Sequence, residues 1–189
     1  MTGMNGAGKT ELSGILCSHF FLGHYEVREF LEAERVKLNM PKGRDSLVWI
    51  ANNLREKHGP ECIMKSLSEK AISIRGSNPF LIESIRCVGE VEYLSKTFGN
   101  KFVLIGVDAP IETRYNRARR RGSQTDVVTF EKFCQQEKFE MEQRDPWKQN
   151  LSECMSLVHK EFLVWNESDN KQKLFNIAQK VGKALGLSQ

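Results

Sequence analysis

The stretch MTGMNGAGKTELSG, residues 1–14, decides the fold because it contains a phosphate-binding motif. Residues 3–10, GMNGAGKT, match the pattern G-x-x-x-x-G-K-S/T at every fixed position. In this motif the backbone N–H groups of a glycine-rich turn wrap a phosphate, the lysine reaches the β- and γ-phosphates, and the Ser/Thr hydroxyl binds Mg²⁺. A glycine-rich turn that binds nothing is the alternative. The motif predicts these phosphate-binding residues: Gly3, Asn5, Gly6, Ala7, Gly8, Lys9 and Thr10.

The strand that should precede this loop is not visible in the sequence. A phosphate loop runs from a buried strand into a helix, whose N-terminal dipole attracts anions. Helical spacing of apolar residues predicts that helix from about residue 9 to 21, but only Met1 and Thr2 precede the first glycine. In a doubly wound sheet this strand is central and buried on both faces. We therefore expect the first strand to be missing, because of a misplaced start codon, a shortened chain or a domain cut from a longer protein.

The composition is that of an ordinary globular protein. At 189 residues, 40% of them hydrophobic, the chain is long enough for one domain over residues 1–189. It has no membrane-length apolar run and no signal-peptide core. Five scattered cysteines favour reduced thiols over disulfides or zinc, which predicts a cytoplasmic protein. The net charge of +4 suits an anionic ligand but is too small to indicate nucleic acid, so we expect neither a nucleic-acid nor a membrane partner.

Helical and strand patterns alternate along the chain, which predicts an α/β layer fold with a mainly parallel sheet. Short strands are expected within residues 24–30 and at 80–82, 102–107 and 162–165. Amphipathic helices fill the intervening segments, and no linker separates them. The run at 102–107, FVLIGV, has the clearest pattern of a buried strand.

An acidic residue follows the strand at residues 80–82. Glu83 would stand at the carboxyl end of that strand, where α/β folds bind ligands, and there it can orient Mg²⁺ through water. Arg86, three residues on, can reach a second phosphate. The alternative is an ordinary salt bridge between Glu83 and Arg86 at a strand end.

With the loop, this segment resembles a known group of enzymes. LIESIR at residues 81–86 is similar to the strand-end Asp-Gly-Phe-Pro-Arg segment of adenylate kinases, with glutamate in place of the aspartate. The resemblance to nucleoside-monophosphate and dephospho-CoA kinases implies an adenylate-kinase-like P-loop NTPase fold, a three-layer sandwich. It also implies ATP and Mg²⁺ as cofactors, with Thr10 and Glu83 at the metal.

Three further stretches resemble a little-characterised branch of that group. They are ANNLREKHGP at residues 51–60, IESIR at 82–86 and DPWKQN at 145–150. The resemblance covers nearly the whole chain. Some members of this branch occur beside or fused to deoxycytidylate-deaminase domains, which implies a deaminase domain or partner as one possibility.

Arginines gather in the helix expected after residue 110. Phosphoryl transfer depends on positioning and on neutralising charge, and arginine offers planar, paired donors to phosphate oxygens. A mobile lid in the resembled kinases carries such arginines, which implies a lid over about residues 114–130 with Arg117 and Arg121 as catalytic residues beside Lys9 and Arg86. A solvated basic face is the alternative. Asn166, after the last strand, resembles the turn that touches adenine.

The acceptor site of the resembled kinases implies an insertion over about residues 28–76. Among its arginines we favour Arg55 and then Arg44 as acceptor ligands, together with Arg86; each could also be a surface residue. The leading hypothesis is an ATP-dependent kinase that acts on a nucleoside or deoxynucleoside monophosphate or on dephospho-CoA. The other is a nucleotide-sensing module with little catalysis that controls a partner such as a deaminase.

Overall fold

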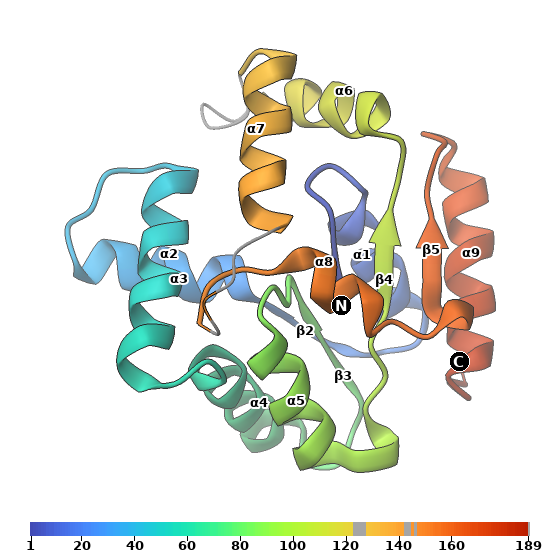
Figure 1. Cartoon of the computed structure of the whole chain (residues 1–189). Helices are drawn as coiled ribbons and strands as arrows, with labels where there is room; N and C mark the ends of the chain where they lie inside the picture. The colour runs from blue at the N-terminus through green and yellow to red at the C-terminus, as the bar shows by residue number, and fades with distance from the viewer. Residues whose placement is uncertain (123–127, 142–144, 146, 189) are drawn as a thin grey trace.

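The computed structural model describes residues 1–122, 128–141, 145 and 147–188 (Figure 1). Residues 123–127 of the lid predicted over about residues 114–130 lie outside this part of the chain. In order, the elements are β1 (Thr2–Gly3), α1 (Lys9–His19), β2 (Gly23–Glu26), α2 (Val27–Lys37), α3 (Arg44–His58), α4 (Cys62–Arg75), β3 (Phe80–Glu83), α5 (Val88–Phe98), η1 (Gly99–Lys101), β4 (Gly106–Asp108), α6 (Ile111–Arg121), α7 (Phe130–Met141), α8 (Leu151–Ser156), η2 (Lys160–Phe162), β5 (Leu163–Trp165) and α9 (Lys171–Ala184).

The strands form a parallel α/β sheet, as the sequence predicts. β2 pairs with β3, and β1, β4 and β5 form a second ladder in that order. A parallel bridge between Thr2 and Ile85 joins the two ladders, so the strands follow the order β2-β3-β1-β4-β5. The carboxyl ends of parallel strands meet at one edge, which brings the loop after β1 beside the residues that follow β2 and β3.

The expectation that the first strand is missing is wrong. Thr2–Gly3 forms β1, and this short strand lies at the centre of the sheet. The Met1 amine donates to the Ile82 carbonyl at 2.7 Å, and the Ile85 N–H donates to the Met1 carbonyl at 3.0 Å. On the other side the Thr2 N–H donates to the carbonyl of Ile105 at 2.8 Å. Backbone bonds on both sides and the buried Met1 side chain hold this strand of two residues in place.

Two apolar clusters hold helices against the sheet. In the first, Leu12 and Leu16 of α1 pack with Ala178 of α9 and with Val107 of β4. In the second, residues of α2, α3, α4 and α5 pack with β3 and with Cys154 of α8. Helices α5 and α8 lie in front of the sheet and α1 behind it in Figure 1, which gives three layers. This arrangement confirms the predicted α/β fold.

Several predicted boundaries shift. The strand predicted at residues 102–107 is shorter in the structure, where β4 spans Gly106–Asp108. The predicted last strand begins one residue later, since Lys160–Phe162 forms a 3-10 turn. Both shifts occur because apolar runs report burial, whereas a strand also requires a neighbour to pair with.

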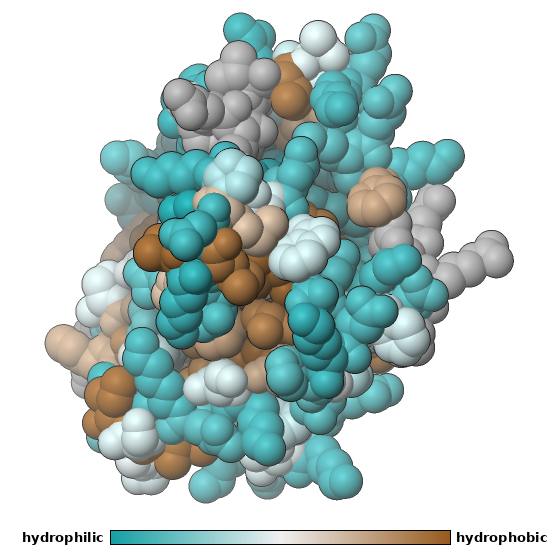
Figure 2. Space-filling view, turned by 90° about the vertical axis from the view of Figure 1, so that its left-hand side faces the viewer, coloured by the Kyte–Doolittle hydropathy of each residue, from teal (hydrophilic) through white to brown (hydrophobic). Residues whose placement is uncertain are grey.

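Helices α2, α3 and α4 form one side of the molecule and α7 stands above them (Figure 1). Figure 2 looks onto this side and shows apolar surface bordered by hydrophilic side chains. The large exposed apolar residues of α2, α3 and α4 are Val36, Trp49, Ile72 and Ile74. Among the described helices, none combines the length and the apolar character that crossing a membrane requires.

Candidate functional site

The phosphate loop follows β1 and leads directly into α1. Gly3 (φ 139°) lies so close to β4 that a Cβ atom would stand 2.1 Å from the Val107 carbonyl oxygen. Gly6 (φ 77°) packs in the same way on the Arg114 carbonyl oxygen, at 2.3 Å. Only glycine combines this φ with so close an approach. The side-chain amide nitrogen of Asn5 is buried and has no hydrogen-bond acceptor among the described residues, which fits a loop that receives an anion.

Lys9 is buried at the start of α1 and turns back over the loop. Its Nζ donates to the carbonyls of Gly3 at 2.9 Å and Met4 at 2.7 Å. Burial, and after it the nearby Arg86 charge, lower the pKa of Lys9 from 10.5 to about 7, although Glu83 and Glu140 act in the opposite direction. In the absence of an anion the ammonium form is therefore poorly stabilised.

This pKa predicts that ATP binding takes up a proton above pH 7. Without ligand, Lys9 is neutral between about pH 7 and 10.5, and a phosphate beside Nζ favours the charged form and raises its pKa. ATP affinity should therefore fall as pH rises through this window. Calorimetry at pH 8.5 in two buffers of different ionisation enthalpy measures the uptake. Lys9→Met should abolish it, and equal heats in both buffers for the wild type would contradict this assignment.

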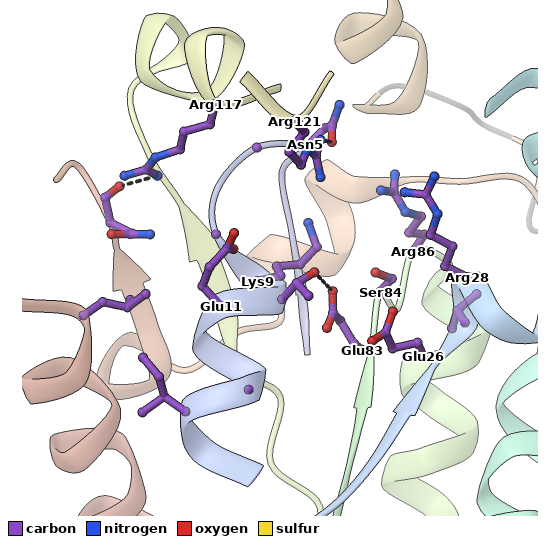
Figure 3. Close-up of a pocket in the computed structure, with 18 of the residues that line it drawn as sticks. Asn5, Lys9, Glu11, Glu26, Arg28, Glu83, Ser84, Arg86, Arg117 and Arg121 are labelled. Carbon is purple, nitrogen blue, oxygen red and sulfur yellow. Dashed lines mark hydrogen bonds between the residues drawn. The ribbon is translucent and has the colours of Figure 1, made fainter. Parts of the chain in front are cut away.

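Thr10 and Glu83 meet where α1 begins and β3 ends. The Thr10 hydroxyl donates to Glu83 Oε1 at 2.7 Å, and His24 Nε2 lies 3.2 Å from Glu83 Oε2. Figure 3 shows Glu83 beside the start of α1, whereas the Lys9 side chain points up into the loop. Glu26, at the end of β2, completes a group of three possible ligands with His24 and Glu83. Burial raises the pKa of Glu26, and the charge of Glu83 raises it further.

These donors fit a divalent cation. A hydroxyl and carboxylates are the oxygen ligands that Mg²⁺ takes, and a cation would relieve the repulsion between the carboxylates of Glu26 and Glu83. The predicted pair of metal residues, Thr10 and Glu83, is thus in direct contact.

Glu83→Gln is expected to weaken binding of Mn²⁺, used as a probe for Mg²⁺ in the presence of ATP, by about 10- to 100-fold. The substitution keeps the size of the side chain but removes the charge. Electron paramagnetic resonance of free Mn²⁺ measures the affinity, and Glu29→Gln on the exposed surface of α2 serves as a charge-matched control. Equal affinities for the variant and the control would show that Glu83 is not a ligand.

Two arginines of α6 reach the phosphate loop. The Arg117 guanidinium donates to the carbonyl of Asn166 at 2.9 Å and of Ala7 at 3.4 Å, and it pairs with Asp169 at 2.7 Å. Arg121 donates to Asn5 Oδ1 at 2.9 Å. Both side chains descend from α6 over the loop in Figure 3. Two guanidinium groups of α6 thus contact the loop or the residue that holds it.

Asn166 holds the loop from below. Its Nδ2 donates to the Ala7 carbonyl at 2.9 Å, and its backbone N–H donates to Asp108 at 2.8 Å. The side chain is buried. The structure thus places this residue, which was predicted to touch adenine, against the phosphate loop; its contact with a base stays a prediction.

Two of the predicted acceptor arginines share one carboxylate. Arg44 of α3 donates through Nε at 3.0 Å, and also through Nη2, to Glu140 Oε1. Arg86 donates through Nη1 to the other oxygen, Oε2, at 2.7 Å and to Gln149 Oε1 at 3.3 Å. Glu140 is 5% exposed. Glu83 and Arg86 therefore have different partners and do not form the salt bridge that was the alternative reading.

Arg55 is the most deeply buried of the predicted acceptor residues. Its Nε and Nη2 donate to Glu90 Oε1 at 3.0 and 2.8 Å, and its side chain is 1% exposed. Burial alone would lower the pKa of Arg55, but the charge and hydrogen bond of Glu90, together with Cys87 and Cys62, outweigh it and the net shift is upward. Nη1 is buried without a hydrogen-bond acceptor in the described part of the chain. Arg55 thus has one guanidinium nitrogen, Nη1, without a partner among the described residues, and its role as an acceptor ligand stays a prediction.

One cavity of about 1140 Å³ connects these groups. It is larger than the usual pocket for one small ligand, so it has room for a donor and an acceptor. Gly3 and Ala7 lie behind the loop surface. The other predicted site residues all line the cavity: Asn5, Gly6, Gly8, Lys9, Thr10, Arg44, Arg55, Glu83, Arg86, Arg117, Arg121 and Asn166.

Several lining residues were not predicted from the sequence. Glu26 follows the rule that singled out Glu83, an acid at the carboxyl end of a strand, and that rule could have found it. Ser84 lines the cavity with φ 73°, a strained conformation for a residue other than glycine. Glu140 and Asp169 carry no sequence signal, because only the tertiary fold brings them to arginines.

The chain has relatives in several archaea, although no family model matches it. It is 30% identical to the UPF0200 protein of Hyperthermus butylicus over 141 residues, which are 75% of this chain and 74% of the relative. The chain belongs to the UPF0200 family. A UPF0200 protein of Methanosarcina mazei is 30% identical over 68% of both chains. The Archaeoglobus fulgidus UPF0200/UPF0201 protein is 31% identical over 143 residues, and the match spans 42% of that longer protein and 74% of this chain.

Solved structures with the fold of this UPF0200 chain include two kinases. A sugar kinase from Janibacter sp. HTCC2649, in an unliganded structure, has a TM-score of 0.52 and 14% identity over 99% of this chain and 92% of that one. Shikimate kinase from Acinetobacter baumannii, in complex with shikimate, has a TM-score of 0.50 and 17% identity over 98% and 90%. The fold is thus the α/β fold of P-loop kinases.

Proposed function

We propose that this UPF0200 chain is an ATP-dependent phosphotransferase that acts on a small nucleotide-type acceptor. A nucleoside or deoxynucleoside monophosphate, or dephospho-CoA, would be such an acceptor. One observation carries the proposal: a single cavity joins the phosphate loop with Lys9 at one end to Arg44 and Arg86 at the other. Lys9 and Arg86 line the same cavity, and the Arg86 charge is one cause of the lowered Lys9 pKa, which supports a site for two phosphates.

The donor end would hold Mg·ATP. The loop backbone and Lys9 are placed for the β- and γ-phosphates, and Thr10 with Glu83 for the metal. Mg²⁺, when bound, neutralises charge on the phosphates. Arg117 and Arg121 add positive charge above the loop, where the transferring group would be. These side chains supply positioning and electrostatic stabilisation, which are the main protein contributions to phosphoryl transfer.

The acceptor end combines an anion site with an apolar wall. Arg28, Arg44 and Arg86 line it, and so do Leu31, Leu47, Val48 and Ala51 from α2 and α3. Arg28 and Arg86 both lie on the α2 side of Glu83 in Figure 3. A molecule with a phosphate and a planar, partly apolar body fits this combination better than a sugar, which is polar throughout.

ADP release from Mg·ATP against a panel of acceptors tests the proposal. The panel contains the common ribo- and deoxyribonucleoside monophosphates, dephospho-CoA, and shikimate and gluconate as acceptors without phosphate. Turnover stimulated by one phosphorylated acceptor is the expected result, and it names the substrate. Stimulation by the unphosphorylated compounds alone would refute a nucleotide-type acceptor.

A second candidate is a nucleotide-sensing module, for which a deaminase domain is one possible partner. The observation that favours it is that Glu140 already neutralises Arg44 and Arg86. The same panel separates the two functions. A sensor binds ATP tightly, with no acceptor accelerating its hydrolysis, whereas a kinase shows acceptor-dependent turnover.

A further inference from the structure

Glu140 stands where an anionic ligand would be expected. Its two carboxylate oxygens are divided between two arginines, with Arg44 on Oε1 and Arg86 on Oε2. The three side chains come from α3, from the turn after β3 and from α7, so the tertiary fold alone brings them together. Arg44 and Arg86 are each 19% exposed, and both line the cavity together with Glu140. The contact is thus part of the cavity wall and accessible to a ligand.

The geometry of this contact is that of arginine bound to an oxyanion. Guanidinium groups bind carboxylates and phosphates through the same pattern of planar, paired donors. Burial would raise the pKa of Glu140, but Arg86 and Arg44 outweigh it and hold that pKa below its usual value. Glu140 is therefore ionised at neutral pH and competes for both arginines as an anion.

We propose that Glu140 is an internal competitor that occupies the anion site of the acceptor pocket until a phosphate monoester displaces it. The identity of that anion as the acceptor rests on the proposed function, but the site itself does not. Arg55 adds a further donor, because its buried Nη1 is without an acceptor in the described residues and the side chain lines the same cavity.

Competition with Glu140 makes the site selective for charge. A neutral nucleoside has no anionic group that could replace the Glu140 carboxylate on the two arginines, so its binding would leave Glu140 in place. A phosphate monoester carries up to two negative charges at neutral pH and has three oxygens, so it can hold both guanidinium groups and outcompete a single carboxylate. Glu140 would thus exclude uncharged acceptors, because an acceptor has to displace it from the arginines in order to bind there.

Binding of inorganic phosphate and of AMP by Glu140→Gln tests the proposal. Calorimetry should give an affinity at least tenfold higher than in the wild type, because the competing charge is gone while the side chain keeps its size. Adenosine should bind the two proteins equally. Glu131→Gln removes one carboxylate from an exposed position of α7 and is the matched control.

The double variant Glu140→Gln/Arg44→Met locates the effect. It should lose the gain, because one of the two arginines is absent. A gain that persists in the double variant would place the anion elsewhere, for example on the phosphate loop, and would overturn the proposal. Phosphate and AMP affinities of Glu140→Gln within twofold of the wild type would overturn it as well.

A second variant covers the case in which Glu140→Gln does not fold. Glu140→Asp keeps the charge but is one methylene shorter, so it cannot reach both arginines; we expect at least threefold tighter phosphate binding. If neither variant folds even in 50 mM phosphate, Glu140 is a fixed part of the fold and the proposal fails. Mg·ATP turnover is measured separately. If the variants bind phosphate as expected but the wild type transfers no phosphoryl group to any acceptor, the kinase function is refuted and the anion site still stands.

Discussion

Lys9→Ala should lower acceptor-dependent ATP turnover by about 10²- to 10³-fold, the loss typical of removing one donor that stabilises transition-state charge. Lys9 lines the cavity, and its Nζ is held over the loop by the Gly3 and Met4 carbonyls. A phosphate in the loop would offer a stronger acceptor than these neutral carbonyls. Turnover of the variant is measured by coupled ADP detection under saturating acceptor.

The control for this substitution is Lys180→Ala, which removes a lysine from an exposed position of α9. It should keep wild-type turnover. Circular dichroism must show that Lys9→Ala is folded, because Lys9 is buried. A folded Lys9→Ala protein with turnover within threefold of the wild type would contradict the role assigned to Lys9.

Glu90→Gln should lower the free energy of unfolding by about 3–5 kcal/mol, the usual cost of removing one partner of a buried ion pair. Glu90 is fully buried, and Oε1 accepts both bonds from Arg55. Oε2 accepts the backbone N–H of Arg86 at 2.9 Å and of Cys87 at 3.1 Å, which fixes the start of α5. A glutamine side chain keeps the shape but leaves the Arg55 charge without a counter-ion.

Urea unfolding followed by tryptophan fluorescence measures this loss. Glu92→Gln, two residues on and exposed on α5, should change the stability by less than 0.5 kcal/mol. The double variant Arg55→Met/Glu90→Gln should recover part of the loss, since no buried charge remains unpaired. A single Glu90→Gln effect below about 1 kcal/mol would mean that water or another group compensates Arg55.

The elements around the loop could be predicted because each depends on local sequence. The loop pattern at residues 3–10, the helix after it and the strand that ends at Glu83 follow from motif and periodicity. The first strand could not, because two residues are too few for a pattern, and β1 is held by partners far along the chain: Ile82, Ile85 and Ile105.

The candidate site could likewise be predicted only where local sequence determines it. The cations could be predicted, since Arg55 and Arg86 lie in recognisable segments and Arg44 in the predicted acceptor insertion, and all three line the cavity. It could not find their partners, Glu90 and Glu140. Which carboxylate lies beside which arginine depends on the packing of α5 and α7, and neither helix carries a motif that records it.

The central position of β1 has a mechanical consequence. Residues 1–3 bond to the β2–β3 ladder through Ile82 and Ile85, and to the β4–β5 ladder through Ile105 and Val107. Within the sheet, a force that pulls the two ladders apart acts on these few backbone hydrogen bonds, which lie next to the phosphate loop. The phosphate loop therefore follows the strand that joins the two halves of the sheet. A movement of one half against the other would displace Gly3 and, through the loop, Lys9.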